Sequence, residues 1–500
     1  MSIGTQIVLQ NCLQYIQKKE FDKARILLKK ENLSSPNNPS VLRLLSVVSA
    51  LSFDYFCALE LIDQVIRLEP ENAIAHSNRG NILKELGRHN EALFSLEKAI
   101  TLQPDYAEAY CNMGNVLQDL HRYAEALGWY DKSIALQPDY AEAYSNKGNA
   151  FEQLGRHEDA LNWYDQSTSV RPGYVDGYWN KAMTQLPSGD FVNGFQNFEA
   201  RWAKSNPVDF LFPEIPRLQN IHNVKGKRIL IWAEQGLGDS LQFCRYIEPL
   251  SILGAEITFL IPKPLISALS AINPFCDLVV NLDSLDLTFD LQSPLMSLPL
   301  AFGTTLESIP VNVPYLKSDS NKRNIFNGFL NKNNNLKVGV VWNGGFRADA
   351  PMLWAINKRR NIELEQIAKL REILGIDFYS LQKGDPAESE LIAKKDTLWP
   401  NIINCVQWLD DFSDTAALIE NLDLIISVDT STAHLAGALG KPVWILNRYD
   451  SCWRWLRGRS DSPWYPTAKI YQQPKPGDWD SVIEQVKTDL NALALQHLNQ

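Results

Sequence analysis

Two short segments in the second half of the chain combine residue types that can carry out chemistry. In the sequence EQGLGDS, at 234–240, Asp239 follows two glycines, Gly236 and Gly238, at the end of an apolar run. Glycines after a strand let a ligand approach the backbone closely, and a carboxylate beside free amide groups can act as a general base. Asp239 is equally suited to capping the following helix, and Glu234 is a rival carboxylate.

The second segment, at 424–440, has the sequence LIISVDTSTAHLAGALG and leads from an apolar run into a helix that begins with Ser and Thr. Asp429, Thr430 and Ser431 open that helix, and the free N–H groups of a helix N-terminus attract anions such as a diphosphate. His434, on the first turn, either adds a donor or packs against the sheet. The two segments together predict an anion site beside a carboxylate.

Short apolar runs that alternate with helical stretches position these segments. Alternation of this kind indicates parallel sheets covered by helices. The runs fall into two blocks, 227–330 and 335–500, preceded by a proline-spaced linker at 206–226. Two such lobes place a cleft at the carboxyl ends of their strands. The runs typical of buried strands are 228–233, 256–260, 278–280, 338–342, 378–381, 424–428 and 443–446.

The first third of the chain repeats with a period of 34 residues, as the spacing of Gly80, Gly114 and Gly148 illustrates. A fixed period of this length is the signature of a solenoid. Small residues mark close helix contacts, and a proline ends the second helix of each unit. Two weaker copies at the start have Ser46 and Cys12 in place of the glycine. The pattern predicts an α-solenoid of five helix–turn–helix repeats and a degenerate cap over 1–205.

One asparagine recurs at the sixth position of the repeats. The first helix of each pair lines the concave face of such a solenoid, and stacked amides there can bond to an extended polypeptide backbone. Asparagine is also common at this turn of the repeat, so a structural role stays open. The four residues are Asn78, Asn112, Asn146 and Asn180.

Composition and charge exclude several classes of function. The net charge of −10 argues against binding to nucleic acid or to an anionic membrane. The apolar runs are too short to span a bilayer. Seven scattered cysteines without a C-x-x-C pair fit a reducing compartment, so we expect a cytoplasmic protein without zinc or disulfides. No histidine cluster or convincing D-x-D loop is present, and we predict no metal.

The repeats resemble the tetratricopeptide repeat (TPR) family. The copy that begins at Ala107 has Tyr110, Gly114, Ala126 and Pro138 at the positions that the family pattern requires. The asparagine series resembles the peptide-binding ladder in the TPR arm of the O-linked N-acetylglucosamine transferases. This resemblance implies a polypeptide partner on the concave face.

The second domain resembles bacterial glycosyltransferases related to the lipopolysaccharide heptosyltransferases, in the subgroup that follows a TPR arm. The tracts that carry the resemblance span about 228–480 and are EQGLGDSLQFCRY, VGVVWNGG, FYSLQKGD, VDTSTAHLAGALGKPVWIL and WRWLRGRSDSPWYP. The resemblance implies a GT-B architecture of two Rossmann-like lobes, with the acceptor on 227–330 and the donor on 335–500. It also implies that the helix at 480–498 crosses back to the first lobe.

The same resemblance implies that Asp239 is the general base of an inverting, metal-independent transfer. Tryptophan faces can stack on sugars or bases, which adds Trp453 of the Trp453–Trp455 loop to the donor side. The residues expected to bind the nucleotide-sugar are Gly236, Gly238, Asn343, Arg347, Arg360, Gln382, Lys383, Asp429, Thr430, Ser431, His434, Trp453 and Arg454.

Taken together, the sequence predicts a TPR solenoid followed by an α/β glycosyltransferase of bacterial type. A nucleotide-sugar would be its co-substrate, without a further cofactor, and a polypeptide held by the TPR arm its acceptor. Two alternatives stay open. The first is an envelope-glycan transferase that uses the repeats for docking, and the second is a TPR scaffold whose transferase domain only binds.

Overall fold

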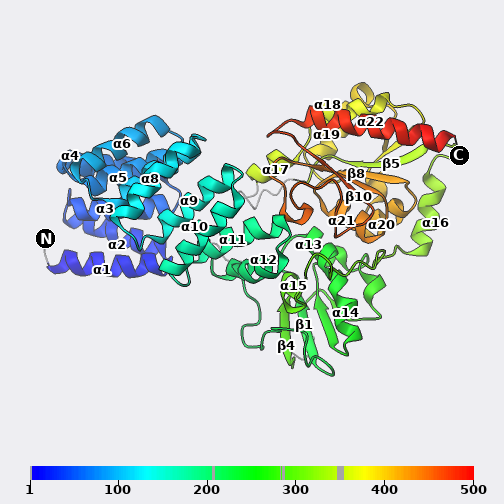
Figure 1. Cartoon of the computed structure of the whole chain (residues 1–500), viewed down its shortest axis with the longest axis horizontal. Helices are drawn as coiled ribbons and strands as arrows, with labels where there is room; N and C mark the ends of the chain where they lie inside the picture. Colours follow the sequence, from blue (N-terminus) through cyan, green and yellow to red (C-terminus); the bar gives the residue numbers. More distant parts are fainter. Residues whose placement is uncertain (1–2, 205–208, 282, 284–287, 346–353, 500) are drawn as a thin grey trace. The chain divides into compact units, whose positions relative to one another are not determined.

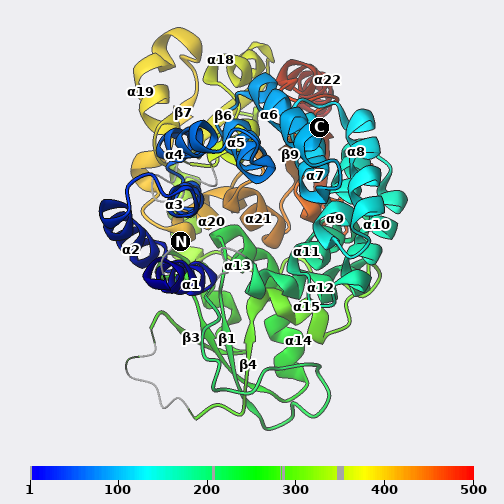
Figure 2. The same ribbon diagram turned by 90° about the vertical axis from the view of Figure 1, so that its left-hand side faces the viewer.

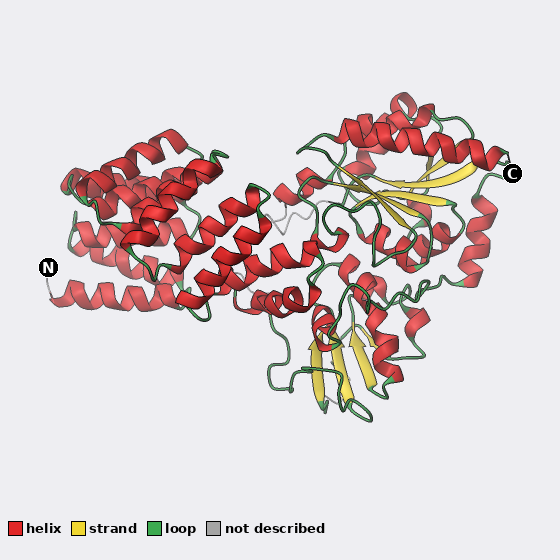
Figure 3. Cartoon of the chain, in the orientation of Figure 1, coloured by secondary structure: helices red, strands yellow, loops and turns green. Residues whose placement is uncertain are grey.

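The chain divides into two compact units. The computed structural model describes residues 3–204, 209–281, 283, 288–345 and 354–499. The units are Met1–Thr184 and Gln185–Gln500, so the division falls inside one helix, α11 (Val175–Ser188). The first unit is built from helices and the second contains two sheets (Figure 3).

The helices of the first part follow one another as pairs with short turns between them. In three successive repeats the first helix begins at Ala73, Ala107 and Ala141, as the 34-residue period predicts. The bounds are α1 (Ile3–Gln17), α2 (Phe21–Ser34), α3 (Pro39–Leu51), α4 (Tyr55–Leu68), α5 (Ala73–Glu85), α6 (His89–Leu102), α7 (Ala107–Asp119), α8 (Tyr123–Leu136), α9 (Ala141–Gln153), α10 (His157–Val170), α11 and α12 (Phe191–Phe198).

The repeating glycine is needed because an aromatic ring lies against it. A Cβ on Gly114 would lie 2.5 Å from Cε1 of Tyr130, and the next repeat has the same geometry. The Tyr130 hydroxyl passes over the glycine and donates to Oδ1 of Asn115 at 2.9 Å. In an earlier repeat that lacks the glycine, Ser46 fills the position and donates to the carbonyl of Ala58 at 2.7 Å. The small residue therefore sets how closely the two helices of a repeat approach.

Two parallel sheets form the second unit. The first has the order β3-β2-β1-β4, and the second has the order β10-β9-β8-β5-β6-β7. The strands are β1 (Arg228–Trp232), β2 (Glu256–Leu260), β3 (Asp277–Val279), β4 (Leu291–Pro294), β5 (Leu336–Val341), β6 (Ile376–Ser380), β7 (Ile403–Asn404), β8 (Leu424–Val428), β9 (Val443–Asn447) and β10 (Ala468–Gln472). The sequence analysis missed β4 and β7, which are short, and β10, in which Lys469 interrupts the apolar residues.

The order of the second sheet is that of a doubly wound Rossmann fold, and the four strands of the first sheet follow the order of the first four strands of that fold. The strand order reverses between β1 and β4 in one sheet and between β5 and β8 in the other. Ligands of such sheets bind at these switch points, outside the carboxyl ends of the strands. The segments after β1 and β8 are the two that the sequence analysis singled out.

Helices cover both faces of the second sheet. In Figure 1, α18, α19 and α22 lie on one face, and α20 and α21 lie on the other. The helices of this unit are α13 (Leu237–Phe243), α14 (Ile247–Ile252), α15 (Leu298–Ala301), α16 (Ser320–Phe329), α17 (Trp354–Arg360), α18 (Leu364–Ile367), α19 (Ala387–Leu398), α20 (Phe412–Glu420), α21 (Ser431–Ala438) and α22 (Trp479–Leu498).

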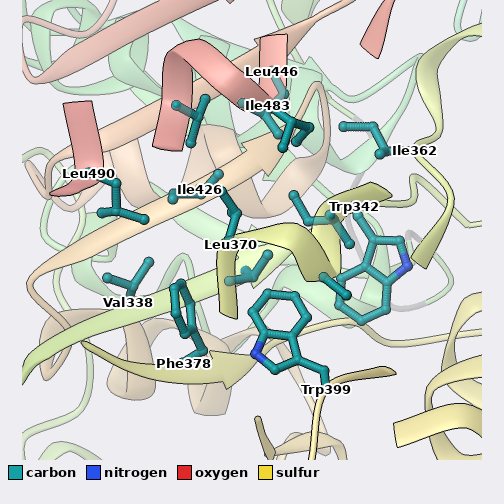
Figure 4. Close-up of a cluster of buried hydrophobic side chains, with 14 of the residues drawn as sticks. Val338, Trp342, Ile362, Leu370, Phe378, Trp399, Ile426, Leu446, Ile483 and Leu490 are labelled. Carbon is teal, nitrogen blue, oxygen red and sulfur yellow. The ribbon is translucent and has the colours of Figure 1, made fainter. Parts of the chain in front are cut away.

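The C-terminal helix does not cross to the first lobe, contrary to the expectation from the resemblance. Its apolar residues, among them Ile483 and Leu490, pack into one core with Val338 and Ile426 of the second sheet (Figure 4). Burial of this stripe fixes α22 along its own sheet. The helix completes the lobe built on the second sheet.

The end of the predicted solenoid also differs from the expectation. The sequence analysis extended the solenoid to residue 205, whereas α12 belongs to the second compact unit. Phe191 and Phe195 of α12 pack on Trp464 and Trp453, with ring centroids 5.3 and 5.7 Å apart. Aromatic burial on this scale outweighs the weak repeat pattern of the segment.

The close approach at Gly114 gives a test of the solenoid packing. Gly114→Ala places a methyl group against the Tyr130 ring, and such overpacking typically costs about 1–3 kcal/mol. Gly128→Ala, on the second helix of the same repeat, is the matched control because a Cβ there meets nothing within 4 Å. Alanine should leave this control unchanged or stabilise it by about 0.5–1 kcal/mol. Urea unfolding of the full chain, followed by circular dichroism, measures both; equal stabilities would contradict the packing account.

Candidate functional site

A largely buried ion pair joins the segment after β1 to the segment after β9, a strand of the other sheet. Asp239, on the first turn of α13, forms the pair through Oδ1 with Nη2 of Arg454. Its other oxygen, Oδ2, accepts a hydrogen bond from the N–H of Gly236 at 2.9 Å. This bond belongs to the capping box of α13. Both carboxylate oxygens are therefore bonded, and Asp239 has the capping role as well as a place in the site.

Arg454 lies in a short 3-10 helix after β9, η9 (Trp453–Trp455). Its guanidinium carbon is 4.5 Å from the centre of the Trp453 ring, and Nη1 is 3.0 Å from Sγ of Cys452. Burial lowers the pKa of Arg454, but the charges of Asp239 and other acidic neighbours more than offset this and raise it. Nε is buried without a hydrogen-bond partner among the described residues. The site thus contains a desolvated, permanently charged cation.

Asp429 and His434 form a second charged group at the start of α21. Oδ1 of Asp429 lies 3.7 Å from Nε2 of His434. Burial raises the pKa of Asp429, but His434, Arg360 and Arg454 lower it by more, so that the pKa lies well below its usual range. The carboxylate is therefore ionised at neutral pH. Asp429 and the nearby arginines balance one another in charge.

His434 is a packed histidine. Its Nδ1 shares a hydrogen bond of 3.0 Å with the Tyr465 hydroxyl, and its ring stacks on Trp455 with centroids 5.1 Å apart. A Cβ on Gly238 would lie 2.8 Å from Cδ2 of His434. Gly238 is thus required where α13 lies beside α21 (Figures 1 and 2), so its structural role is to let the two helices meet.

The N-terminus of α21 supplies N–H groups at the same place. Thr430 is the N-cap residue but gives the helix no side-chain capping bond. Its hydroxyl instead shares a hydrogen bond of 2.9 Å with Ser427. Thr430 and Ser431 are partly exposed. The positive end of the helix dipole therefore lies close to Arg454 and Arg360.

Arg360 and Gln382 organise the segment after β5. Nη1 of Arg360 donates to the carbonyl of Asp429 at 3.0 Å, and Nη2 donates to Oδ1 of Asn357 at 2.7 Å. The side chain of Gln382 accepts from the N–H of Asn343 at 2.9 Å and donates to its carbonyl at 3.1 Å. Arg360 thus contacts Asp429, whereas Gln382 is hydrogen-bonded to the backbone of Asn343.

Two of the residues predicted to bind the donor make structural contacts instead. Nζ of Lys383 bonds to the carbonyls of Leu409 and Asp410, and no described contact joins it to the ion pair. The ring of Trp453 is covered by phenylalanines of α12 and is 7% exposed, so it is part of the core. Arg347 lies outside the described residues.

Sequence reasoning missed a buried network behind the ion pair. Glu234, whose side chain is 0% exposed, accepts from Nη2 of Arg201 at 3.0 Å and from the N–H of Met296 at 3.4 Å. Burial raises the pKa of Glu234 to about 7, and Arg201 opposes the rise. Arg201 lies in the segment that the repeat pattern assigned to the solenoid, so no motif linked it to Glu234.

Within the described residues, no helix is both long and apolar enough to span a lipid bilayer. No group of three or more His, Cys, Asp or Glu side chains in that part of the chain is arranged to hold a metal ion.

Comparison with known proteins identifies the repeats. The family described as "Tetratricopeptide repeat" matches residues 105–172, and the one described as "TPR repeat" matches residues 80–121. The first unit contains TPR repeats. Among solved structures, MamA is 25% identical over 34% of this chain and 95% of its own, with a TM-score of 0.28. A thermophilic TPR protein from Thermus thermophilus is 21% identical over 36% of this chain and 98% of its own, with a TM-score of 0.35.

The match to one curated relative extends beyond the TPR repeats. Protein FlbA of Caulobacter vibrioides is 26% identical over an alignment of 338 residues, and the match covers 62% of this chain and 54% of FlbA. The chain thus spans about half the length of this relative. Since the first unit ends at Thr184, a match over 62% of the chain must continue into the second unit.

The asparagines of the TPR repeats link one repeat to the next. Nδ2 of Asn112 donates to Oγ of Ser77 at 3.1 Å, and Nδ2 of Asn180 donates to Oγ of Ser145 at 3.1 Å. Asn146 donates to Cys111 in the same way. Asn112 is only 6% exposed, whereas Asn78, Asn146 and Asn180 are partly exposed. Nδ2 of Asn146 also donates to Oδ1 of Asn115 at 3.0 Å, which leaves this side chain its amide oxygen for another ligand. A primary amide has two N–H groups and an oxygen, so Asn180 keeps capacity for both kinds of bond.

Burial of Glu234 leads to a prediction for pH. The pKa of this carboxyl is about 7 in the folded protein, against its usual 4.5. Between these values the folded state holds a proton that the unfolded state has lost, so the free energy of unfolding falls as the pH rises. The loss from this group is at most about 3 kcal/mol. Glu234→Gln has no carboxyl proton to lose. Its free energy of unfolding should therefore rise relative to that of the parent as the pH increases from 5 to 8.

Melting temperatures at several pH values measure this difference. Glu256→Gln, which changes an exposed residue of the same lobe, is the control and should follow the parent. If the parent and Glu234→Gln keep a constant difference from pH 5 to 8, Glu234 does not titrate in this range.

Proposed function

We propose that the second unit is a GT-B glycosyltransferase, which moves a sugar from a nucleotide-sugar donor to an acceptor hydroxyl or amide with inversion and without a metal. The observation that carries the proposal is the Asp239–Arg454 ion pair, at the carboxyl ends of strands from two Rossmann-type sheets. Doubly wound sheets bind nucleotides at such ends. A paired carboxylate and guanidinium supply the base and the diphosphate-binding cation that the transfer needs.

The diphosphate of the donor would bind at the start of α21. Helix N–H groups and the dipole favour an anion there, and Thr430 and Ser431 are partly exposed. Arg454 would form bidentate hydrogen bonds with phosphate oxygens. These groups stabilise the negative charge that develops on the leaving nucleoside diphosphate.

Asp239 would act as the base once the donor has bound. In the free protein its Oδ1 is held by Arg454, so this oxygen is not available to an acceptor. The diphosphate competes for Arg454 and frees Oδ1. An acceptor oxygen or nitrogen then attacks the anomeric carbon and gives its proton to Asp239. The bond from the sugar to the diphosphate breaks, and the leaving group takes the electron pair.

This competition predicts an unusual effect of a charge-removing substitution. Asp239→Asn releases Arg454, so UDP, GDP or ADP, whichever the parent binds, should bind about 5-fold or more tightly. The same variant should lose release of the sugar from the matching nucleotide-sugar. Arg454→Ala should weaken binding of the nucleoside diphosphate. Isothermal titration calorimetry and product chromatography measure the two effects.

An exposed pair of the same kind nearby gives matched controls. Arg459 and Asp461 are paired at 2.7 Å, with side chains 38% and 65% exposed. Arg459→Ala and Asp461→Asn should change neither binding nor turnover. No binding of any nucleotide to folded parent or variants would contradict the transferase proposal and favour the scaffold. Binding with undiminished sugar release in Asp239→Asn would remove Asp239 from the role of base.

The TPR repeats are proposed to hold the acceptor polypeptide. TPR repeats favour a protein partner, and the partly exposed asparagines can bond to an extended backbone. We expect Asn146→Ala with Asn180→Ala to weaken binding of unstructured Ser- and Thr-rich peptides several-fold, measured by fluorescence anisotropy. Asn90→Ala, on the exposed face of α6, is the control. Unchanged peptide affinity in the double variant would leave these asparagines with a purely structural role.

A further inference from the structure

The segment from α12 to the short 3-10 helix η1 (Glu199–Ala203) has a pattern of burial that the repeat sequence does not explain. Phe198 of α12 and Phe243 of α13 both pack on the Trp453 ring, with centroids 6.1 and 6.2 Å away. Trp453 immediately precedes Arg454. The segment therefore packs against the loop that carries Arg454, one partner of the ion pair.

The same segment also supports the strand that leads to the other partner. The rings of Trp202 in η1 and Trp232, the last residue of β1, lie 5.7 Å apart. Glu234 is two residues beyond Trp232, and Gly236, whose N–H donates to Asp239, follows two residues later. Contact with η1 thus reaches the start of the segment that holds Asp239.

Arg201 of η1 makes the polar part of this contact and is 3% exposed. Its Nη2 donates to Oε1 of Glu234 at 3.0 Å and to Oγ of Ser297 at 2.7 Å. Nη1 donates to Oε1 of Glu199 at 2.7 Å. One guanidinium is therefore bonded to its own helix, to the segment after β1 and to the segment after β4.

The bonds of Glu234 extend this support to both partners of the ion pair. Its Oε2 accepts from the N–H of Met296 at 3.4 Å. Sδ of Met296 lies 3.9 Å from Nη2 of Arg454. Glu234 thus links Arg201 to the segment after β1, which carries Asp239, and to the segment after β4, which carries Met296. A shift of its carboxylate would break the bond to Met296, while its backbone leads directly to Gly236.

We propose that Arg201 is a positioning residue of the site. It holds Glu234 and Ser297 in place, so that Asp239 meets Arg454 and is later released beside the bound donor. This inference rests on the proposed function and deepens it. It also assigns the last segment of the predicted solenoid to the machinery of the second unit.

A direct truncation of Arg201 would not separate positioning from stability. Arg201→Met leaves Glu234 buried without its cation, and a lone buried charge is strongly destabilising. The decisive variant is Arg201→Met with Glu234→Gln, which removes both charges and keeps similar side-chain volumes. Arg201→Lys keeps the charge but cannot bridge three partners. Lys475→Met makes the same change to a side chain that is 76% exposed and is the control.

The test uses the full-length chain, with the tightest-binding nucleotide among UDP, GDP and ADP, and with pyrophosphate as a second probe. If Arg201 positions Asp239 against Arg454, the double variant frees Arg454 and binds the nucleotide about 5-fold more tightly, as Asp239→Asn does. In an Asp239→Asn background the double variant should add no further tightening. Sugar release should fall at least about 10-fold, with an intermediate rate for Arg201→Lys.

The outcomes separate the two proposals. A folded double variant whose nucleotide affinity and sugar release match those of Lys475→Met overturns the positioning role and leaves the transferase proposal intact. Equal further tightening in the Asp239→Asn background also overturns it, because Arg201 would then act independently of Asp239. Binding of pyrophosphate alone, with the expected tightening, supports positioning but contradicts a nucleotide donor. No binding of any probe to any variant overturns both.

Discussion

The second unit depends on the ion pair between Asp239 and Arg454. Two opposite charges removed from water are tolerated only when they remain paired and hydrogen-bonded, so this contact fixes the segments that carry them. Arg454 also packs on Trp453 and contacts Met296, while Asp239 caps its own helix. The ends of β1 and β9, which belong to different sheets, are held together for this reason, and α13 can pack on α21 at Gly238.

Charge in this region is balanced in small groups. Asp239 pairs with Arg454, Asp429 lies among His434 and arginines, and Glu234 pairs with Arg201. A site of this kind has no strong net charge to attract an anion from a distance. Under the proposed function, an incoming diphosphate would exchange partners with a carboxylate. Such an exchange would link binding of the anion to release of Asp239 as the proposed base.

The TPR repeats use side-chain amides and hydroxyls for a different purpose. A tyrosine that crosses a glycine sets the spacing within a repeat, and an asparagine that reaches back 35 positions links one repeat to the next. These bonds satisfy polar groups on the face where a polypeptide would bind. Since a primary amide has two donors and one acceptor oxygen, the same side chain can hold the solenoid together and still contact a ligand.

The sequence by itself determined the solenoid and the existence of the parallel sheets, because helical and strand periodicity are local properties of the chain. It also placed Asp239 and Asp429 after strands, where motif spacing is informative. Only the tertiary structure decided that Arg454 pairs with Asp239, that Lys383 lies elsewhere and that α22 stays on its own sheet. It likewise assigned Arg201 to the second unit. Such contacts join residues far apart in the chain, and burial and charge pairing choose them after the elements have packed.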